Sequence, residues 1–247
     1  MNLLGKNLLI LLAFMLAPAA FAQTSNLPGV SVSFGQGTNL VDTIEVLLLF
    51  TILTLAPAII ILCTSFTRIV VVLSFMRQAL GTQNMPPNQL LIGFALFLSI
   101  FVMMPTGESI YKNSLQPYTE KKIDATQALK GLETDLRAFM QKHVRKADIG
   151  LFYDVTGAAA PDDINGVPTH YLIPAFIISE LKTAFQIGFL LYIPFIVLDM
   201  VVASVLMAMG MMMLPPMLVS MPFKLLLFVL VDGWQLVTGA ILRSFNT

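Results

Sequence analysis

Charged side chains are concentrated in one internal segment of the sequence. Of the 14 basic and 14 acidic residues, 17 lie between residues 108 and 170, although the chain has 247 residues. Long stretches on both sides of this segment are apolar and nearly free of charge. The pattern predicts a signal peptide over 1–22, a hydrophobic helical hairpin over 23–107, a polar insert over 108–170 and a second hydrophobic hairpin over 171–247.

Composition supports an all-α integral membrane protein. Apolar residues make up 57% of the chain and charged residues 11%, with a mean hydropathy of +0.83. Soluble domains carry about 25% charged residues, so lipid or protein must cover much of this surface. The net charge is zero, which gives no sign of a nucleic-acid partner. Cys63 is the single cysteine, so we interpret it as an apolar packing residue.

The N-terminus has the pattern of a cleavable signal peptide. Lys6 precedes an apolar run from Leu8 to Leu16, and Ala20-Phe21-Ala22 follows. The alternative is a first transmembrane helix, but the run has only about half of the ~20 residues that a span needs. We therefore expect residue 23 to lie outside the inner membrane.

Basic residues predict which way the first hairpin faces. Its apolar legs run from Ile44 to Leu80 and from Leu90 to Met104, with a turn over residues 81–88. Arg68 and Arg77 flank this turn, and excess basic residues near short loops mark the cytoplasmic side. The insert that follows should then be periplasmic.

Helical periodicity and prolines indicate the remaining elements. Between Ala128 and Val144, apolar residues recur at helical spacing, which predicts an amphipathic helix in the insert. The second hairpin should start near Pro174 and turn at Pro215-Pro216. Prolines and lone charges interrupt the apolar legs, as at Pro57 and Arg68. A backbone break in hydrocarbon lacks hydrogen-bond partners, so we expect these hairpins to pack mainly against other protein.

Motifs of common enzyme classes were sought and are not found. The sequence has no phosphate-binding G-x-x-x-x-G-K-[ST] loop, no G-x-S-x-G elbow and no H-E-x-x-H pair. His143 and His170 are not spaced as metal ligands. We therefore predict no enzyme activity, no cofactor and no metal site.

Methionines cluster at the tip of the second hairpin, in Met209-Gly210-Met211-Met212-Met213-Leu214-Pro215-Pro216. Methionine is flexible and polarisable, so a ring of such loops could seal a pore and deform around a passing polypeptide. The plainer alternative is that methionine is an ordinary apolar residue here, and a Cu(I) site is a third reading. Three methionines in a row beside glycine and two prolines favour a gasket made of Met209, Met211, Met212 and Met213.

Isolated charges and aromatic residues suggest further sites. Ionisable groups within apolar segments usually have partners, so we expect buried charges at Arg68, Asp199, Lys224 and Asp232. Snorkelling is the alternative for Lys182 and Lys224. Aromatic residues are enriched at interface cores. This predicts subunit contacts at Phe152, Phe176 and Phe185, although the aromatic residues could equally form the core of the insert. Glu180 and Lys182 lie two positions apart on the expected helix and point in different directions, so each could contact a neighbouring subunit.

Several segments of the sequence are distinctive: Pro174-Ala175-Phe176-Ile177-Ile178-Ser179-Glu180-Leu181-Lys182, Met211-Met212-Met213-Leu214-Pro215-Pro216, Pro222-Phe223-Lys224, Asp232-Gly233-Trp234 and Thr64-Ser65-Phe66-Thr67-Arg68. These segments resemble the FliP family of flagellar type III secretion export-gate proteins. The resemblance extends over essentially the whole chain, and related subunits also serve virulence-type injectisomes. It implies a ring of five copies that is joined by FliQ-like and FliR-like subunits in one helical assembly.

The resemblance also implies a role and a location. The assembly is the export gate of the flagellar basal body in the bacterial inner membrane, projecting largely to the periplasmic side. It passes unfolded flagellar proteins with other export components. Family knowledge assigns the gasket to Met211–Met213 and subunit contacts to Phe152 and Glu180. Competing hypotheses are a secondary transporter or proton channel using Asp199 and Glu180, and an intramembrane hydrolase, for which we can nominate no nucleophile.

Overall fold

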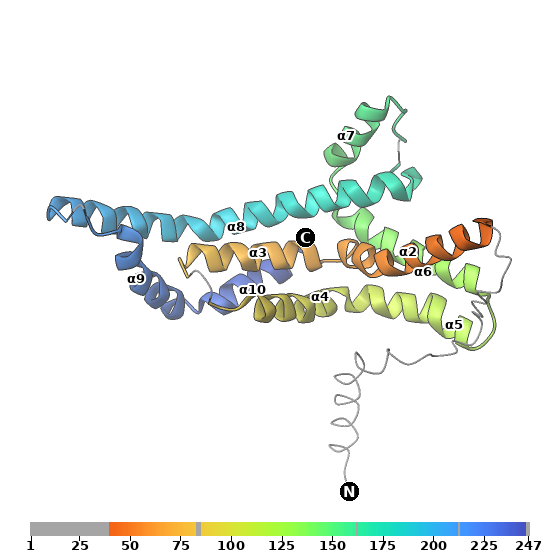
Figure 1. Cartoon of the computed structure of the whole chain (residues 1–247), viewed down its shortest axis with the longest axis horizontal. Coiled ribbons are helices and arrows are strands. Elements are labelled where there is room, and N and C mark those ends of the chain that lie inside the picture. The colour runs from red at the N-terminus through yellow and green to blue at the C-terminus, as the bar shows by residue number, and fades with distance from the viewer. Residues whose placement is uncertain (1–39, 83–84, 162, 212, 246–247) are drawn as a thin grey trace, which may run out of the picture. The chain divides into compact units, whose positions relative to one another are not determined.

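Every regular element in the described part of the chain is a helix (Figure 1). The computed structural model describes residues 40–82, 85–161, 163–211 and 213–245. The expected signal peptide and Met212 lie outside these residues. The helices are α2 Leu40–Leu62, α3 Phe66–Ala79, α4 Asn88–Ile110, the π-helix η2 Tyr111–Leu115, α5 Gln116–Thr119, α6 Ala125–His143, α7 Lys146–Thr156, the 3-10 turn η3 Ile164–Gly166, α8 Thr169–Ala208, α9 Pro216–Leu230 and α10 Gly233–Arg243.

The first expected leg, Ile44 to Leu80, consists of two helices. The chain divides into two compact units after Leu53, a boundary that lies inside α2. We expected interruptions at Pro57 and Arg68, but α2 continues through Pro57 and the break lies between Leu62 and Phe66. Thr64 and Ser65 occupy this break, where the Thr64 hydroxyl accepts a hydrogen bond from the backbone N–H of Phe66. Such local side-chain bonds compete with helical ones, so two hydroxyl residues end α2 where a single proline does not.

The core of the second unit lies between α3 and α8. Figure 1 shows α3 running alongside α8, and these two helices share the most extensive packing in the chain. Side chains from α3 and α8 are fully buried against each other, with α4, α6 and α10 closing the sides. The buried residues of this core include Ile69, Val72, Leu73, Met76, Leu172, Ala175, Phe176 and Ala184.

The polar insert is helical, as its periodicity predicts. The expected helix over 128–144 is α6, which begins three residues earlier because Asp124 caps it. The Asp124 carboxylate accepts a hydrogen bond from the backbone N–H of Gln127. In return, the side-chain oxygen of Gln127 accepts one from the backbone N–H of Asp124. The Leu151-Phe152-Tyr153 segment lies within α7, which packs on α8.

Two helical stretches of the described residues are long and apolar enough to cross a membrane. They are Asn88–Thr119, which joins α4 to α5, and Thr169–Ala208, which is α8. A third candidate is the pair α9 and α10, bent by 66° at its break. Only 11% of the most apolar window of α8 is buried within the chain. Most of that window therefore needs a cover of lipid or of other protein.

Candidate functional site

The tip between α8 and α9 is shaped by one glycine and two prolines. Gly210 has φ +75°, a left-handed conformation that glycine adopts without steric cost. The N–H of Gly210 donates to the carbonyl of Met207, and the N–H of Met211 donates to that of Leu206, both at 3.0 Å. These two bonds form a Schellman motif that ends α8. Pro216 then starts α9 at a position where proline is favoured, so α9 begins at the second proline of the predicted tip.

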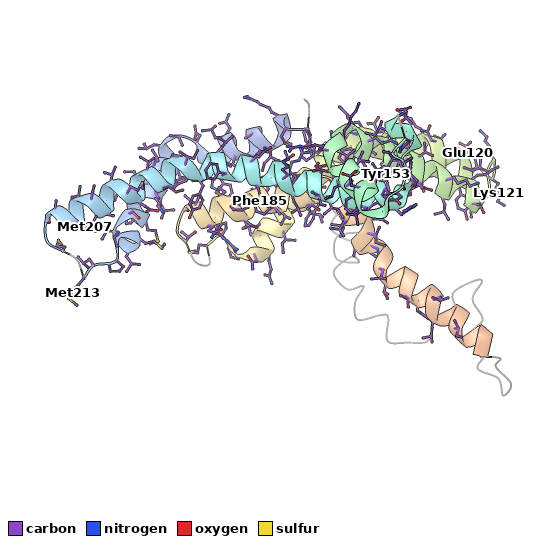
Figure 2. All side chains as sticks on the ribbon, turned by 90° about the horizontal axis from the view of Figure 1, so that it is seen from above. Glu120, Lys121, Tyr153, Phe185, Met207 and Met213 are labelled. Carbon is purple, nitrogen blue, oxygen red and sulfur yellow. The ribbon has the colours of Figure 1, made fainter. Side chains whose placement is uncertain are left out.

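The methionines of the tip project from the fold. Met213 is 98% exposed, and Met209 and Met211 are exposed as well. Figure 2 shows Met213 pointing away from the end of the hairpin, beyond Met207 on α8. The described residues therefore place a soft apolar surface where this chain alone leaves it uncovered.

A buried ion pair joins α8 to α9 near the tip. Lys224 on α9 is 2% exposed, and its Nζ lies 2.6 Å from Oδ2 of Asp199 on α8. The hydroxyl of Ser220 donates to the other carboxylate oxygen of Asp199 at 2.5 Å. Asp199 is partly open, with 31% of its side chain exposed. Lys224 and Asp199 thus have partners, as their isolation in sequence predicts.

Arg68 is the hub of a second buried cluster. Its Nε donates to Oε2 of Glu180 at 2.8 Å, and its Nη2 lies 2.5 Å from Oε1. Its Nη1 donates to the carbonyl oxygen of Ser244 at 2.7 Å. The guanidinium carbon also lies 3.8 Å from the centre of the Phe245 ring. Arg68 therefore ties α3 to α8 and to the residues that follow α10.

The residues predicted at subunit contacts lie in different environments. Phe176 is fully buried and makes an edge contact with Phe139, with ring centres 6.0 Å apart. Glu180 is also fully buried, against Arg68. A direct contact of Phe176 or Glu180 with a second copy would require the fold to open. Phe152 is half-buried, whereas Lys182 and Phe185 are exposed on α8.

Asp232 departs from the expectation of a buried charge. It is exposed at the break between α9 and α10 and adopts a left-handed conformation with φ 51° and ψ 50°. Asp tolerates this region better than most residues because its side chain is short and polar. The residue marks the bend in the third candidate span, and its carboxylate faces out of this chain.

Comparison with known sequences settles the family. The sequence model of the FliP family matches residues 49–241. The flagellar biosynthetic protein FliP of Bacillus subtilis (strain 168) is 54% identical over 207 residues, covering 84% of this chain and 94% of the relative. The protein of the same name from Aquifex aeolicus (strain VF5) is 48% identical over 226 residues, with 90% and 93% covered. That of Borreliella burgdorferi is 46% identical over 245 residues, with 95% and 96% covered.

This chain belongs to the FliP family. It is accordingly a membrane component of the flagellar export apparatus that acts in flagellum biosynthesis, and it is not an enzyme. The methionine tip, the Asp199–Lys224 pair and the Arg68–Glu180 pair all lie within the residues that the family model matches.

Ser220 is a residue of the candidate site that sequence reasoning missed. It lies four positions before Lys224, so both side chains share one face of α9. A hydroxyl and a lone lysine at that spacing in an apolar helix could have indicated a polar site. The Ser244–Phe245 contact with Arg68 was also missed, and no spacing rule connects residues so far apart in sequence.

Among the residues that the structure describes, no group of three or more histidine, cysteine, aspartate or glutamate side chains could hold an ion. Outside the candidate spans, burial lowers the pKa of His143 from 6.5 to about 4, aided by the charges of Arg68 and Lys142. His143 is thus held neutral, with Phe139 and Phe245 edge-on to its ring.

Proposed function

We propose that this chain is a pore-forming subunit of the flagellar type III protein export gate. In this proposal several copies, five by resemblance to the family, surround a conduit with FliQ-like and FliR-like subunits. Unfolded flagellar proteins pass through it across the bacterial inner membrane, and a large part of the assembly projects into the periplasm. The methionine tips of the copies close the conduit between export events.

The observation that carries this proposal is the exposed methionine tip. Met213 has 98% of its surface exposed although methionine is apolar. The same tips of other copies, arranged around an axis, could cover this surface. Thioether side chains repack around different shapes. A constriction that they form can exclude water and ions and still deform around a polypeptide.

The outer surface of α8 supports assembly with other copies. Lys182 and Phe185 line a surface hollow of about 550 Å³ together with Ile178, Leu181, Gln186 and Phe189. We propose Lys182, Phe185 and the half-buried Phe152 as direct subunit contacts. Phe176 and Glu180 then influence these contacts through the packing of α8, because both are buried within the chain.

The alternative of a secondary transporter or proton channel relies on the carboxylates of Asp199 and Glu180, and both form ion pairs within the chain. Glu180 is ion-paired with Arg68, and Asp199 is ion-paired with Lys224 and bonded to Ser220. A proton relay needs carboxylates that share a path for protons, whereas each of these two is held in an ion pair of its own. No observation therefore favours a proton channel over a protein-export pore.

The test is the ion conductance of the assembled complex in planar bilayers. Replacing Met211 and Met213 by alanine should raise conductance at rest at least several-fold, while flagellar protein export in cells largely persists. Exposed Leu129 on α6 offers a control, because Leu129→Ala removes an apolar side chain far along the sequence from the tip. Unchanged conductance in a complex of normal composition would contradict the methionine seal.

A further inference from the structure

The position of the methionine tip depends on few contacts behind it. From Asp199 to the end of α8 at Ala208 the helix extends about 14 Å at 1.5 Å per residue. On the other limb, Ser220 lies one turn after the start of α9. The Asp199, Ser220 and Lys224 side chains, here called the hairpin clasp, are thus the polar link between α8 and α9 that the described residues show nearest the tip.

The hairpin clasp lies beside apolar side chains that offer Lys224 no other hydrogen-bond partner. An apolar hollow of about 400 Å³ lies beside it, lined by Leu198, Val201, Val202, Phe223, Leu226, Leu227 and Leu230. These residues offer no side-chain hydrogen-bond partner, so the buried Lys224 ammonium depends on Asp199. Separating α8 from α9 here would leave a buried charge without its partner, which is strongly disfavoured.

Lys224 also abuts the first hairpin. Gly81, in the turn between α3 and α4, has φ +74°, and a Cβ built on it would lie 3.9 Å from Lys224 Nζ. The ammonium is therefore bonded to Asp199 on α8 and lies close to the α3–α4 turn.

We propose that Lys224 is a positioning residue of the export gate. Its ion pair with Asp199, which Ser220 also bonds, locks α8 to α9 at a place close to the α3–α4 turn. The methionine tip is held at one distance from the first hairpin in the closed gate. This proposal rests on the proposed function for its meaning, but its test is a distance and needs no export.

The experiment measures that distance by electron spin resonance in the assembled complex. Spin labels are placed at Met213→Cys and Gln89→Cys, both exposed positions, in a Cys63→Ser chain diluted with unlabelled copies. The clasp is removed by the double change D199N/K224M, which leaves neither charge unpaired and so allows folding. The matched control, E108Q/K112M, removes an exposed ion pair of 3.6 Å in the same way.

The proposal predicts one narrow distance distribution in the parent and in the control. In D199N/K224M the distribution should broaden or shift by about 5 Å, one helical turn, while the copy number of the complex stays the same. An unchanged distribution in D199N/K224M would overturn the proposal. If D199N/K224M leaves the distance unchanged while the methionine substitutions raise conductance, the hairpin clasp is rejected and the pore proposal is supported. If D199N/K224M changes the distance while the methionine substitutions leave conductance unchanged, the clasp is supported and the methionine seal is rejected.

Discussion

Arg68 and Glu180 form a two-point ion pair that is almost completely removed from water. The two side chains are 4% and 0% exposed, and they come from positions 112 residues apart. The pair joins α3 to α8, the two helices at the centre of the core. It lies among apolar side chains such as Phe176, where a single unpaired charge would be strongly disfavoured.

Removing one partner of this pair should destabilise the chain itself. Glu180→Ala strands the Arg68 guanidinium, so we expect a loss of about 3–5 kcal/mol in unfolding free energy. Denaturant unfolding of the purified chain in detergent would measure it. The double change R68L/E180L should recover much of the loss. Glu120→Ala, at an exposed pair with Lys122, serves as the control and should leave stability unchanged. A stable Glu180→Ala chain that only fails to form rings would contradict this account.

Close approach of α3 and α8 requires a glycine at position 188. A Cβ built there would lie 2.8 Å from Cγ and 3.0 Å from Cβ of Phe75, so the ring would have to move. Gly188→Ala should therefore destabilise the chain by about 1–3 kcal/mol, as measured by thermal unfolding. Gly107→Ala on α4 meets no atom within 4 Å and should be neutral or stabilising, since alanine favours helix. Equal effects of the two changes would refute the packing argument.

His143 should make stability fall in mild acid. Its pKa is about 4 in the folded chain against an ordinary 6.5, because burial disfavours the charged ring. Between pH 6.5 and 4 the unfolded chain binds a proton that the folded chain does not, so stability decreases as pH falls; above pH 6.5 this contribution is constant. His143→Phe keeps the ring packing against Phe139 but cannot titrate. Its melting temperature should fall less than the parent's between pH 7.5 and 5, and equal slopes would count against the prediction.

Gly210 should be needed for the shape of the tip. Its φ of +75° is unfavourable for residues with a Cβ, so Gly210→Val should disturb the end of α8 and raise the resting conductance of the complex. Gly210→Asn is the matched control, because asparagine tolerates the left-handed region, and it should behave like the parent. If valine and asparagine give the same conductance as glycine, the turn does not set the seal.

Local sequence patterns predicted where helices begin and end better than which side chains pair with each other. The spacing of apolar residues identified α6, and Pro215-Pro216 located the tip because proline starts a helix but seldom continues one. Pro174 and Pro194 nevertheless lie inside α8, so a single proline does not mark the end of a helix here. The same limit applies to the site. Lone charges signalled that partners exist, but the pairing of Arg68 with Glu180 depends on tertiary contacts that no short pattern encodes.

The most direct test of the pore is contact between the tip and a protein in transit. A photo-crosslinking amino acid at Met213, which is more exposed than Met209 and Met211, is combined with a flagellar export substrate stalled by a folded fusion partner. The same amino acid at exposed Leu129 on α6 is the control. The account predicts an adduct between this chain and the stalled substrate at position 213 and none at 129. An export-competent complex with no substrate adduct at position 213 would contradict it.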